Sequence, residues 1–106
     1  MSRVKFNTEY NGKRVEVIGG WDSPLKYYHF TIFNLDCPEE DEDVIWGCLD
    51  NFRFSELPKT NEPYKKLLKD MNIEPPSGFW DRCDKKEGNV FYTYTINGTW
   101  NRQDIG

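Results

Sequence analysis

The dipeptide Asn11-Gly12 restricts the possible folds of this 106-residue chain more than any other local pattern. Asn-Gly supplies the positive φ angles of a type I′ turn, which joins two antiparallel strands tightly. A turn at this point sets Phe6 opposite Val17 and Glu9 opposite Arg14. In that register the apolar residues share one face and the charged residues share the other. We therefore predict an antiparallel hairpin over residues 4–17, with a Glu9–Arg14 ion pair across it.

A second Asn-Gly dipeptide, Asn97-Gly98, predicts a second hairpin near the end of the sequence. Its first strand, residues 90–96, consists of β-branched and aromatic residues, which favour an inner strand. Its return, residues 99–102, is short and polar, which favours an edge. Between the hairpins, residues 26–35 and 44–49 are predicted to pair as two further strands. Residues 19–24 are expected to form a turn with a bulge or corner.

One helix is predicted between the strand over residues 44–49 and the second hairpin. Apolar residues recur there at helical spacing: Tyr64, Leu67, Leu68 and Met71. Asn61 or Thr60 is expected to cap its start, and Asn72 is expected to end it in the left-handed conformation. A second, short helix is predicted over residues 78–84.

The order of elements is therefore β-β-β-β-α-α-β-β, which is typical of an α+β fold. We expect an antiparallel sheet of about five to six strands, with the main helix and the short helix packed on one face. The length fits a single domain over residues 1–106. Aromatic residues make up 16% of the chain, so the core is expected to be built from rings. The face without helices is expected to expose some of these rings: Trp21, Tyr27, Phe91 and Trp100.

The negative charge is concentrated in one short segment. Residues 36–50 carry seven acids and no base, which exceeds the net charge of −4 of the whole chain. A mimic of DNA would instead spread its carboxylates over a face. The densest run has three interpretations, which are a solvated loop, a docking patch for a basic partner and a divalent-cation site. That run is Glu39, Glu40, Asp41, Glu42 and Asp43. Because the alternating ligands and central glycine of a calcium loop are absent, we predict no metal site.

The cysteines indicate a reducing compartment. Their number is odd, and no two lie at C-x-x-C spacing, which argues against a disulfide framework and a zinc site. We expect reduced thiols, with Cys48 and Cys83 in the core. We expect a cytoplasmic protein without a signal peptide, and no apolar run is long enough to span a membrane.

No motif supports catalysis, a cofactor or nucleic-acid binding. The single histidine, His29, is interpreted as a packing residue, although Cys48 or Cys83 beside it would suggest a nucleophile pair. Phosphate-binding glycine motifs and hydrolase motifs are missing. The aromatic strand over residues 90–96 lacks the basic and glycine residues of an RNA-binding sheet.

The first functional hypothesis is a non-catalytic protein-binding module, whose partner is a basic protein or a second copy of the chain. It would use exposed aromatics and the acidic run: Trp21, Tyr27, Phe91, Trp100 and Glu39, Glu40, Asp41, Glu42, Asp43. In size and charge the chain resembles small accessory proteins of bacteria and phages, which include inhibitors and immunity proteins. The alternative is a small-ligand or enzymatic pocket lined by Trp21, Tyr28, His29 and Cys48.

Overall fold

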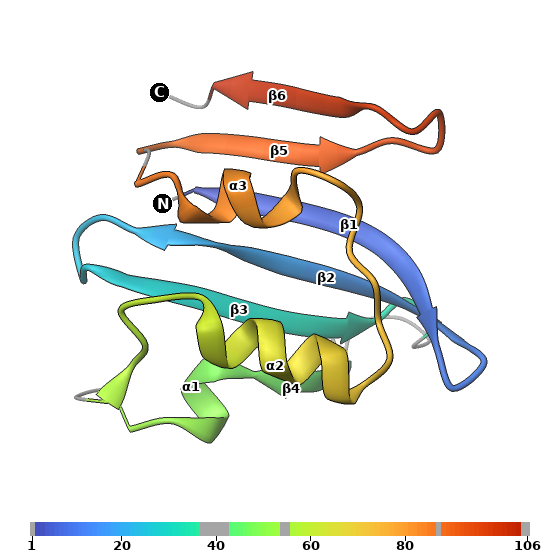
Figure 1. The fold of residues 1–106 in the computed structure, drawn as a ribbon, viewed down its shortest axis with the longest axis horizontal. Helices are drawn as coiled ribbons and strands as arrows, with labels where there is room; N and C mark the ends of the chain where they lie inside the picture. Colours follow the sequence, from blue (N-terminus) through green and yellow to red (C-terminus); the bar gives the residue numbers. More distant parts are fainter. Residues whose placement is uncertain (1, 37–42, 54–55, 87, 105–106) are drawn as a thin grey trace.

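The fold is a mixed β-sheet with two helices on one face, as Figure 1 shows. The computed structural model describes residues 2–36, 43–53, 56–86 and 88–104. The strands within these ranges are β1 (Arg3–Tyr10), β2 (Lys13–Asp22), β3 (Tyr27–Asn34), β4 (Asp43–Gly47), β5 (Val90–Tyr94) and β6 (Trp100–Asp104). The helices are α1 (Cys48–Asn51), α2 (Glu62–Asp70) and α3 (Phe79–Asp84). The predicted α+β class and the six strands are confirmed.

The strands lie in the order β4-β3-β2-β1-β5-β6. Neighbours are antiparallel except for β1 and β5, which run parallel and place Val4 opposite Tyr92. The expectation of a wholly antiparallel sheet is therefore wrong at this one pairing. Its cause is the crossover, because the chain leaves β4, passes over one face as α2 and α3, and re-enters beside β1 in the same direction.

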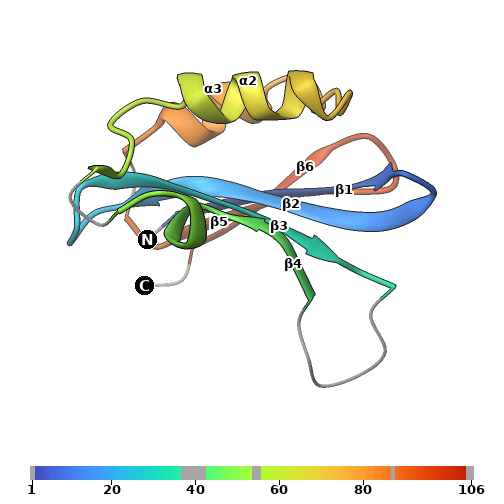
Figure 2. The same ribbon diagram turned by 90° about the horizontal axis from the view of Figure 1, so that it is seen from below.

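Helices α2 and α3 lie together over one face of the sheet, as predicted (Figure 2). The predicted strand over residues 44–49 is shorter than expected, because it ends at Gly47 and continues as the single turn α1. Gly47 is the last β4 residue that pairs with β3. Beyond this point the Tyr28 N–H donates to the Pro58 carbonyl at 3.2 Å, so another segment occupies the edge of β3.

The first predicted hairpin is confirmed. Asn11 and Gly12 have φ angles of 52° and 78°, as a type I′ turn requires. Glu9 faces Arg14 in the predicted register. The predicted ion pair is wrong, because the Arg14 Nε donates to the Asp36 carboxylate at 2.8 Å instead.

The second hairpin uses a longer loop than its Asn-Gly dipeptide predicts. Of the two residues only Gly98 has a positive φ, at 81°, and Thr95 N–H donates to the Thr99 carbonyl at 2.8 Å. This loop sets Tyr94 opposite Trp100. A two-residue loop would have turned the Trp100 ring to the other face, away from the helices.

The main helix begins and ends close to the predicted residues. Asn72 has a φ of 58°, and the Ile73 N–H donates to the Leu68 carbonyl at 2.9 Å, which closes the helix end as expected. Asn61 precedes the helix, but its side chain makes no capping bond. Its amide instead donates to the Asp84 carboxylate at 2.6 Å, which ties α2 to the end of α3.

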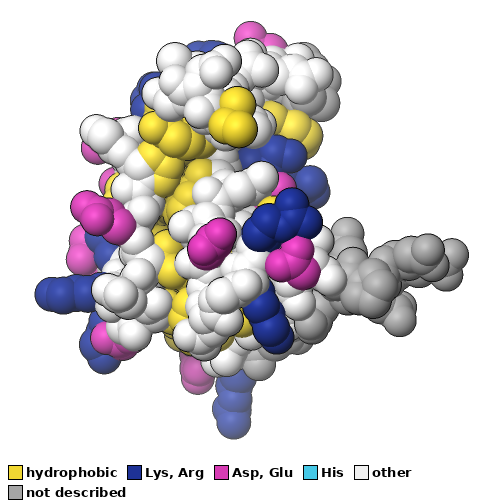
Figure 3. Space-filling model, turned by 90° about the vertical axis from the view of Figure 1, so that its right-hand side faces the viewer, with side chains coloured by type: hydrophobic (Ala, Val, Ile, Leu, Met, Phe, Trp, Pro, Cys, Tyr) yellow, Lys and Arg dark blue, Asp and Glu magenta, His cyan; other side chains and the backbone are white. Residues whose placement is uncertain are grey.

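The core between helices and sheet is built from rings, as predicted. Phe30 is fully buried, and its ring stacks on Tyr64 at 4.8 Å and on Trp80 at 6.0 Å between centroids. Cys48 and Cys83 are buried free thiols, which confirms that expectation. Figure 3, which looks at the end of the molecule where α2 ends, shows a band of apolar side chains flanked by charged ones.

Two glycines in β2 occupy a place where a turn was expected. Gly19 and Gly20 lie within the regular ladder opposite Phe30 and His29, so the predicted corner at residues 19–24 is displaced to the β2–β3 connection. A Cβ at Gly20 would clash with the Ser2 carbonyl oxygen and lie 2.8 Å from His29 Nε2. The glycine therefore gives room for the chain start to pack against the sheet.

Candidate binding surfaces

Most of the aromatic residues predicted to be exposed are covered. Trp21 and Tyr27 keep only 8% and 5% of their surface, so the prediction that they are exposed is wrong. Trp100 is half-buried on the helix-covered face, where its Nε1 donates to the Ser77 carbonyl at 3.0 Å and its ring stacks on Phe79. A chain with few aliphatic residues uses such rings to fill its core.

Phe91 is the predicted ring that does lie on the uncovered face. It is half-buried, and the guanidinium of Arg3 on the neighbouring strand lies 5.3 Å from its ring centroid. Phe91 is also separated from β4 by three intervening strands, so it does not extend any surface at that edge.

The four residues of the alternative pocket do not converge. The Trp21 and Tyr28 rings touch at 4.8 Å on the helix-covered face. His29, the next residue in the strand, projects to the opposite face, because successive side chains of a strand alternate. Cys48 is buried at the start of α1, where it neighbours the Tyr64 hydroxyl. A single pocket lined by all four residues is therefore wrong.

His29 anchors the start of the chain. Its Nε2 lies 2.6 Å from the Ser2 carbonyl oxygen, and the Trp21 N–H donates to Ser2 Oγ at 2.9 Å. Burial lowers the pKa of the imidazole, and the nearby Arg3 guanidinium lowers it further, against the hydrogen bond to Ser2. The packing interpretation of His29 fits this geometry, since the ring is largely buried and its Nε2 contacts the backbone of Ser2.

The acidic run lies mostly outside the described residues. Glu39, Glu40, Asp41 and Glu42 are not described, and Asp43 is described only as the first backbone position of β4. At the end of β3, Asp36 accepts hydrogen bonds from the Arg14 backbone N–H at 2.9 Å and from its guanidinium. These bonds hold the pKa of the Asp36 carboxyl below its usual value.

The uncovered face carries a small apolar surface near the β4 edge, which we call the β3–β4 patch. It consists of Ile18, Phe33 and Val44. Phe33 pairs with Val44, and Ile18 pairs with Thr31, two residues before Phe33 on the same face. Val44 is 39% exposed, and the other two are half-buried. Aromatic content alone did not predict this patch. The alternation of apolar and polar residues along β2 and β3 is the pattern that indicates it.

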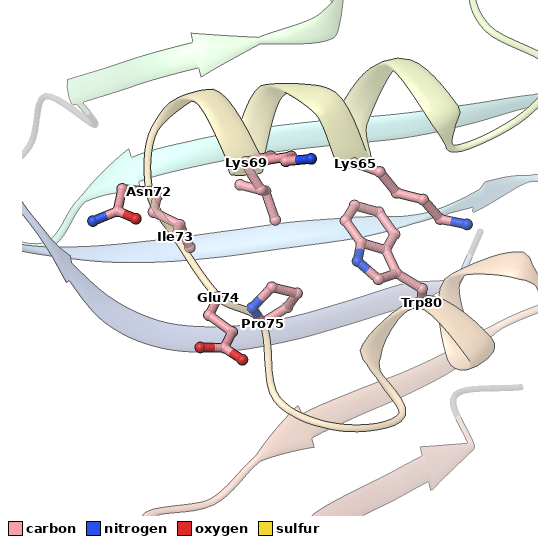
Figure 4. A pocket seen from close by; sticks show the side chains of 8 residues that line it. Lys65, Lys69, Asn72, Ile73, Glu74, Pro75 and Trp80 are labelled. Carbon is pink, nitrogen blue, oxygen red and sulfur yellow. The ribbon is translucent and has the colours of Figure 1, made fainter.

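A groove opens on the other side of the molecule, between α2 and α3 (Figure 4). Its volume is about 460 Å³. Side chains from α2, from α3 and from the segment joining them line it: Lys65, Leu68, Lys69, Asn72, Ile73, Glu74, Pro75 and Trp80. None of these residues was predicted as a site residue, although the basic spacing of Lys65 and Lys69 on one helix face could have indicated it.

Comparisons with known proteins and the remaining features assign no chemistry. No protein-family model, curated protein or solved structure matches the chain. Within the described residues, no group of three or more His, Cys, Asp or Glu side chains could hold a metal ion. The helices of these residues are all too short or too polar to cross a membrane.

Proposed function

We propose that this protein is a non-catalytic protein-binding module of the inhibitor or immunity type, which binds a basic partner through the β3–β4 patch. The observation that supports the proposal best is the one-sided cover of the sheet. Helices α2 and α3 lie on one face, and the opposite face leaves Val44 exposed beside half-buried Phe33 and Ile18.

Charge complementarity supports a basic partner. The chain that joins the end of β3 to the start of β4 contains the run Glu39–Asp43, so the acidic residues border the patch in sequence on both strands. Carboxylates around an apolar centre steer a basic surface into contact and accelerate association, while the apolar centre retains it. Because β4 is the last strand of the sheet, its outer backbone groups can also pair with an extended segment of the partner.

Two further parts of the proposal rest on the sequence. A second copy of the chain is the alternative occupant of the same patch, because homodimers also use apolar surfaces. A cytoplasmic location fits the buried, free thiols of Cys48 and Cys83, which a reducing compartment would maintain.

The test captures partners from a lysate of the native host with matched baits. The wild-type chain is compared with Val44→Lys, which places a cation in the patch, and with Ile96→Lys, which makes the same change at a fully exposed residue of the β5–β6 loop. A basic protein retained by the wild type and by Ile96→Lys should be lost with Val44→Lys. Sedimentation of the purified chain identifies self-association by its mass.

Neutralising the acidic run tests the electrostatic part. Replacing Glu39, Glu40, Glu42 with Gln and Asp41, Asp43 with Asn should slow association with the captured protein and reduce its salt dependence. The proposal is wrong if Val44→Lys retains the same proteins as Ile96→Lys, or if a captured protein binds at a rate that neither salt nor the neutralised run changes.

A further inference from the structure

The groove between α2 and α3 has a rigid apolar lining. Leu68 and Ile73 are buried, and Pro75 and the Trp80 indole stand beside them. The Trp80 ring stacks almost parallel on Phe30, at an interplanar angle of 16°, and meets Phe79 edge-on at 4.8 Å. Because the core fixes this indole, a flat apolar group entering the groove would meet an already ordered surface.

The polar groups at the rim are mainly donors. Lys65 and Lys69 rise from α2 four residues apart, and Figure 4 shows Lys69 on the α2 side of the groove and Lys65 extending toward Trp80. Lys65 Nζ lies 5.8 Å from the Trp80 ring centroid and 3.3 Å from the Glu62 carboxylate. Among the described residues, neither Lys69 nor the Trp80 indole N–H has an ion-pair or hydrogen-bond partner. The groove therefore offers unused donors to a ligand.

The one acid that lines the groove does not neutralise these donors. Glu74 lies on the segment that joins α2 to α3, and Figure 4 shows its carboxylate directed away from Trp80. Within the described residues, Glu74 forms no ion pair with either lysine. Lys65 is already paired with Glu62, so the groups beside the groove that favour an anion are the unpartnered Lys69 and the Trp80 indole N–H, although the whole chain carries a net charge of −4.

We infer that this groove binds a small carboxylic acid with a flat apolar body. The body stacks on Trp80 against Pro75 and Ile73, and the carboxylate accepts from Lys65, Lys69 and the indole N–H. The volume of about 460 Å³ lies in the range of small-molecule sites. Bare phosphate would leave the apolar wall unused, and a cation would meet two ammonium groups. This site lies on the opposite side of the sheet from the β3–β4 patch, so it stands or falls independently of the proposed function.

The test follows the four indole N–H signals by NMR during titration with 3-phenylpropionate. Trp80→Phe assigns the relevant signal and keeps a ring in the wall. The acid should shift the Trp80 signal and the amides of Lys69, Asn72 and Ile73 in a saturable manner. The neutral isostere 3-phenylpropionamide should bind at least about 3-fold more weakly, because exposed ion pairs contribute modestly in water.

Lysine variants on α2 test which positive charges bind the acid. Lys65→Gln with Lys69→Gln should weaken binding of the acid by about 5- to 10-fold, the combined effect of two exposed ion pairs. Lys66→Gln removes an exposed lysine of the same helix that does not line the groove, and it should change the affinity less than about 1.5-fold, because surface charges outside a site contribute little.

Three outcomes would overturn the inference. Equal affinity for the acid and the amide would show that the groove does not select an anion. Equal effects of Lys66→Gln and the double variant would show that the acid does not bind in this groove. Binding of a blocked Phe-Glu dipeptide, without binding of the free acid, would give the groove to a peptide of a partner protein instead.

Discussion

The two faces of the sheet differ in what their side chains contact. On the covered face, Phe30 is fully buried and stacks on rings from both α2 and α3. Three residues further along the same strand and on the other face, Phe33 is half-buried beside the exposed Val44. The same residue type thus serves packing on one face and remains accessible on the other.

We expect the covered face to determine the stability of the fold and the uncovered face to serve recognition. Burial of rings beneath the helices contributes most of the hydrophobic free energy, whereas the uncovered face adds little to it. A sheet covered on one face can therefore change its outer residues at small cost to the fold.

The largest effect is expected from truncating the two phenylalanines of β3. Phe30→Ala should lower the free energy of unfolding by about 3–5 kcal/mol, because it leaves a cavity among stacked rings. Phe33→Ala should lower it by about 1 kcal/mol or less. Urea denaturation monitored by circular dichroism measures both values, and similar losses would contradict the separation of the faces.

A smaller effect is expected where the chain start meets the uncovered face. Gly20→Ala should cost about 1–3 kcal/mol, because its Cβ would displace the Ser2 carbonyl and crowd His29. Gly88→Ala is the control, since a Cβ there meets no atom within 4 Å. Thermal denaturation compares the two variants, and an equal change in both would show that the Ser2 contact is unimportant.

In the second hairpin, a covered and an uncovered apolar residue can be compared directly. Trp100→Ala should cost about 1–2 kcal/mol, through the loss of stacking on Phe79 and of the bond to Ser77. Ile96→Ala, in the exposed loop, should change stability by less than about 0.5 kcal/mol. If Ile96→Ala were the more damaging change, the observed register would be wrong.

The smallest effect is a pH dependence of stability from His29. Since burial lowers the pKa of His29 in the folded state, the unfolded chain binds the proton first as pH falls below about 6.5. Stability should therefore decrease between pH 6.5 and the lower folded pKa. His29→Gln should flatten this part of the curve of unfolding free energy against pH, and an unchanged slope would rule out His29 as its source.

The two Asn-Gly dipeptides show how far the sequence predicts the fold. At Asn11-Gly12 the local turn and the alternation of the strands agree, so the register could be read directly. At Asn97-Gly98 the local signal predicts a two-residue loop, but the packing of Trp100 against Phe79 requires a longer one. The favourable contact is remote in sequence, and local propensity cannot reveal it.

The same limit applies to the parallel β1–β5 pairing and to the candidate sites. Strand pairing across the helical crossover depends on where α3 ends, which no local pattern encodes. Exposed rings could not be identified from aromatic content, because Trp21 and Tyr27 are needed in the interior. The groove residues Lys69 and Trp80 come together only through the packing of α2 and α3.

A recognition surface at β3 and β4 can be tested by comparing substitutions of two aromatic residues of the uncovered face as capture baits. Phe33→Lys lies in the β3–β4 patch, whereas Phe91→Lys lies outside it, on β5. Both variants should fold, and Phe33→Lys should retain at least about 10-fold less of the basic partner than wild type, while Phe91→Lys retains it. Equal retention by both variants, or loss with Phe91→Lys alone, would contradict a recognition surface at β3 and β4.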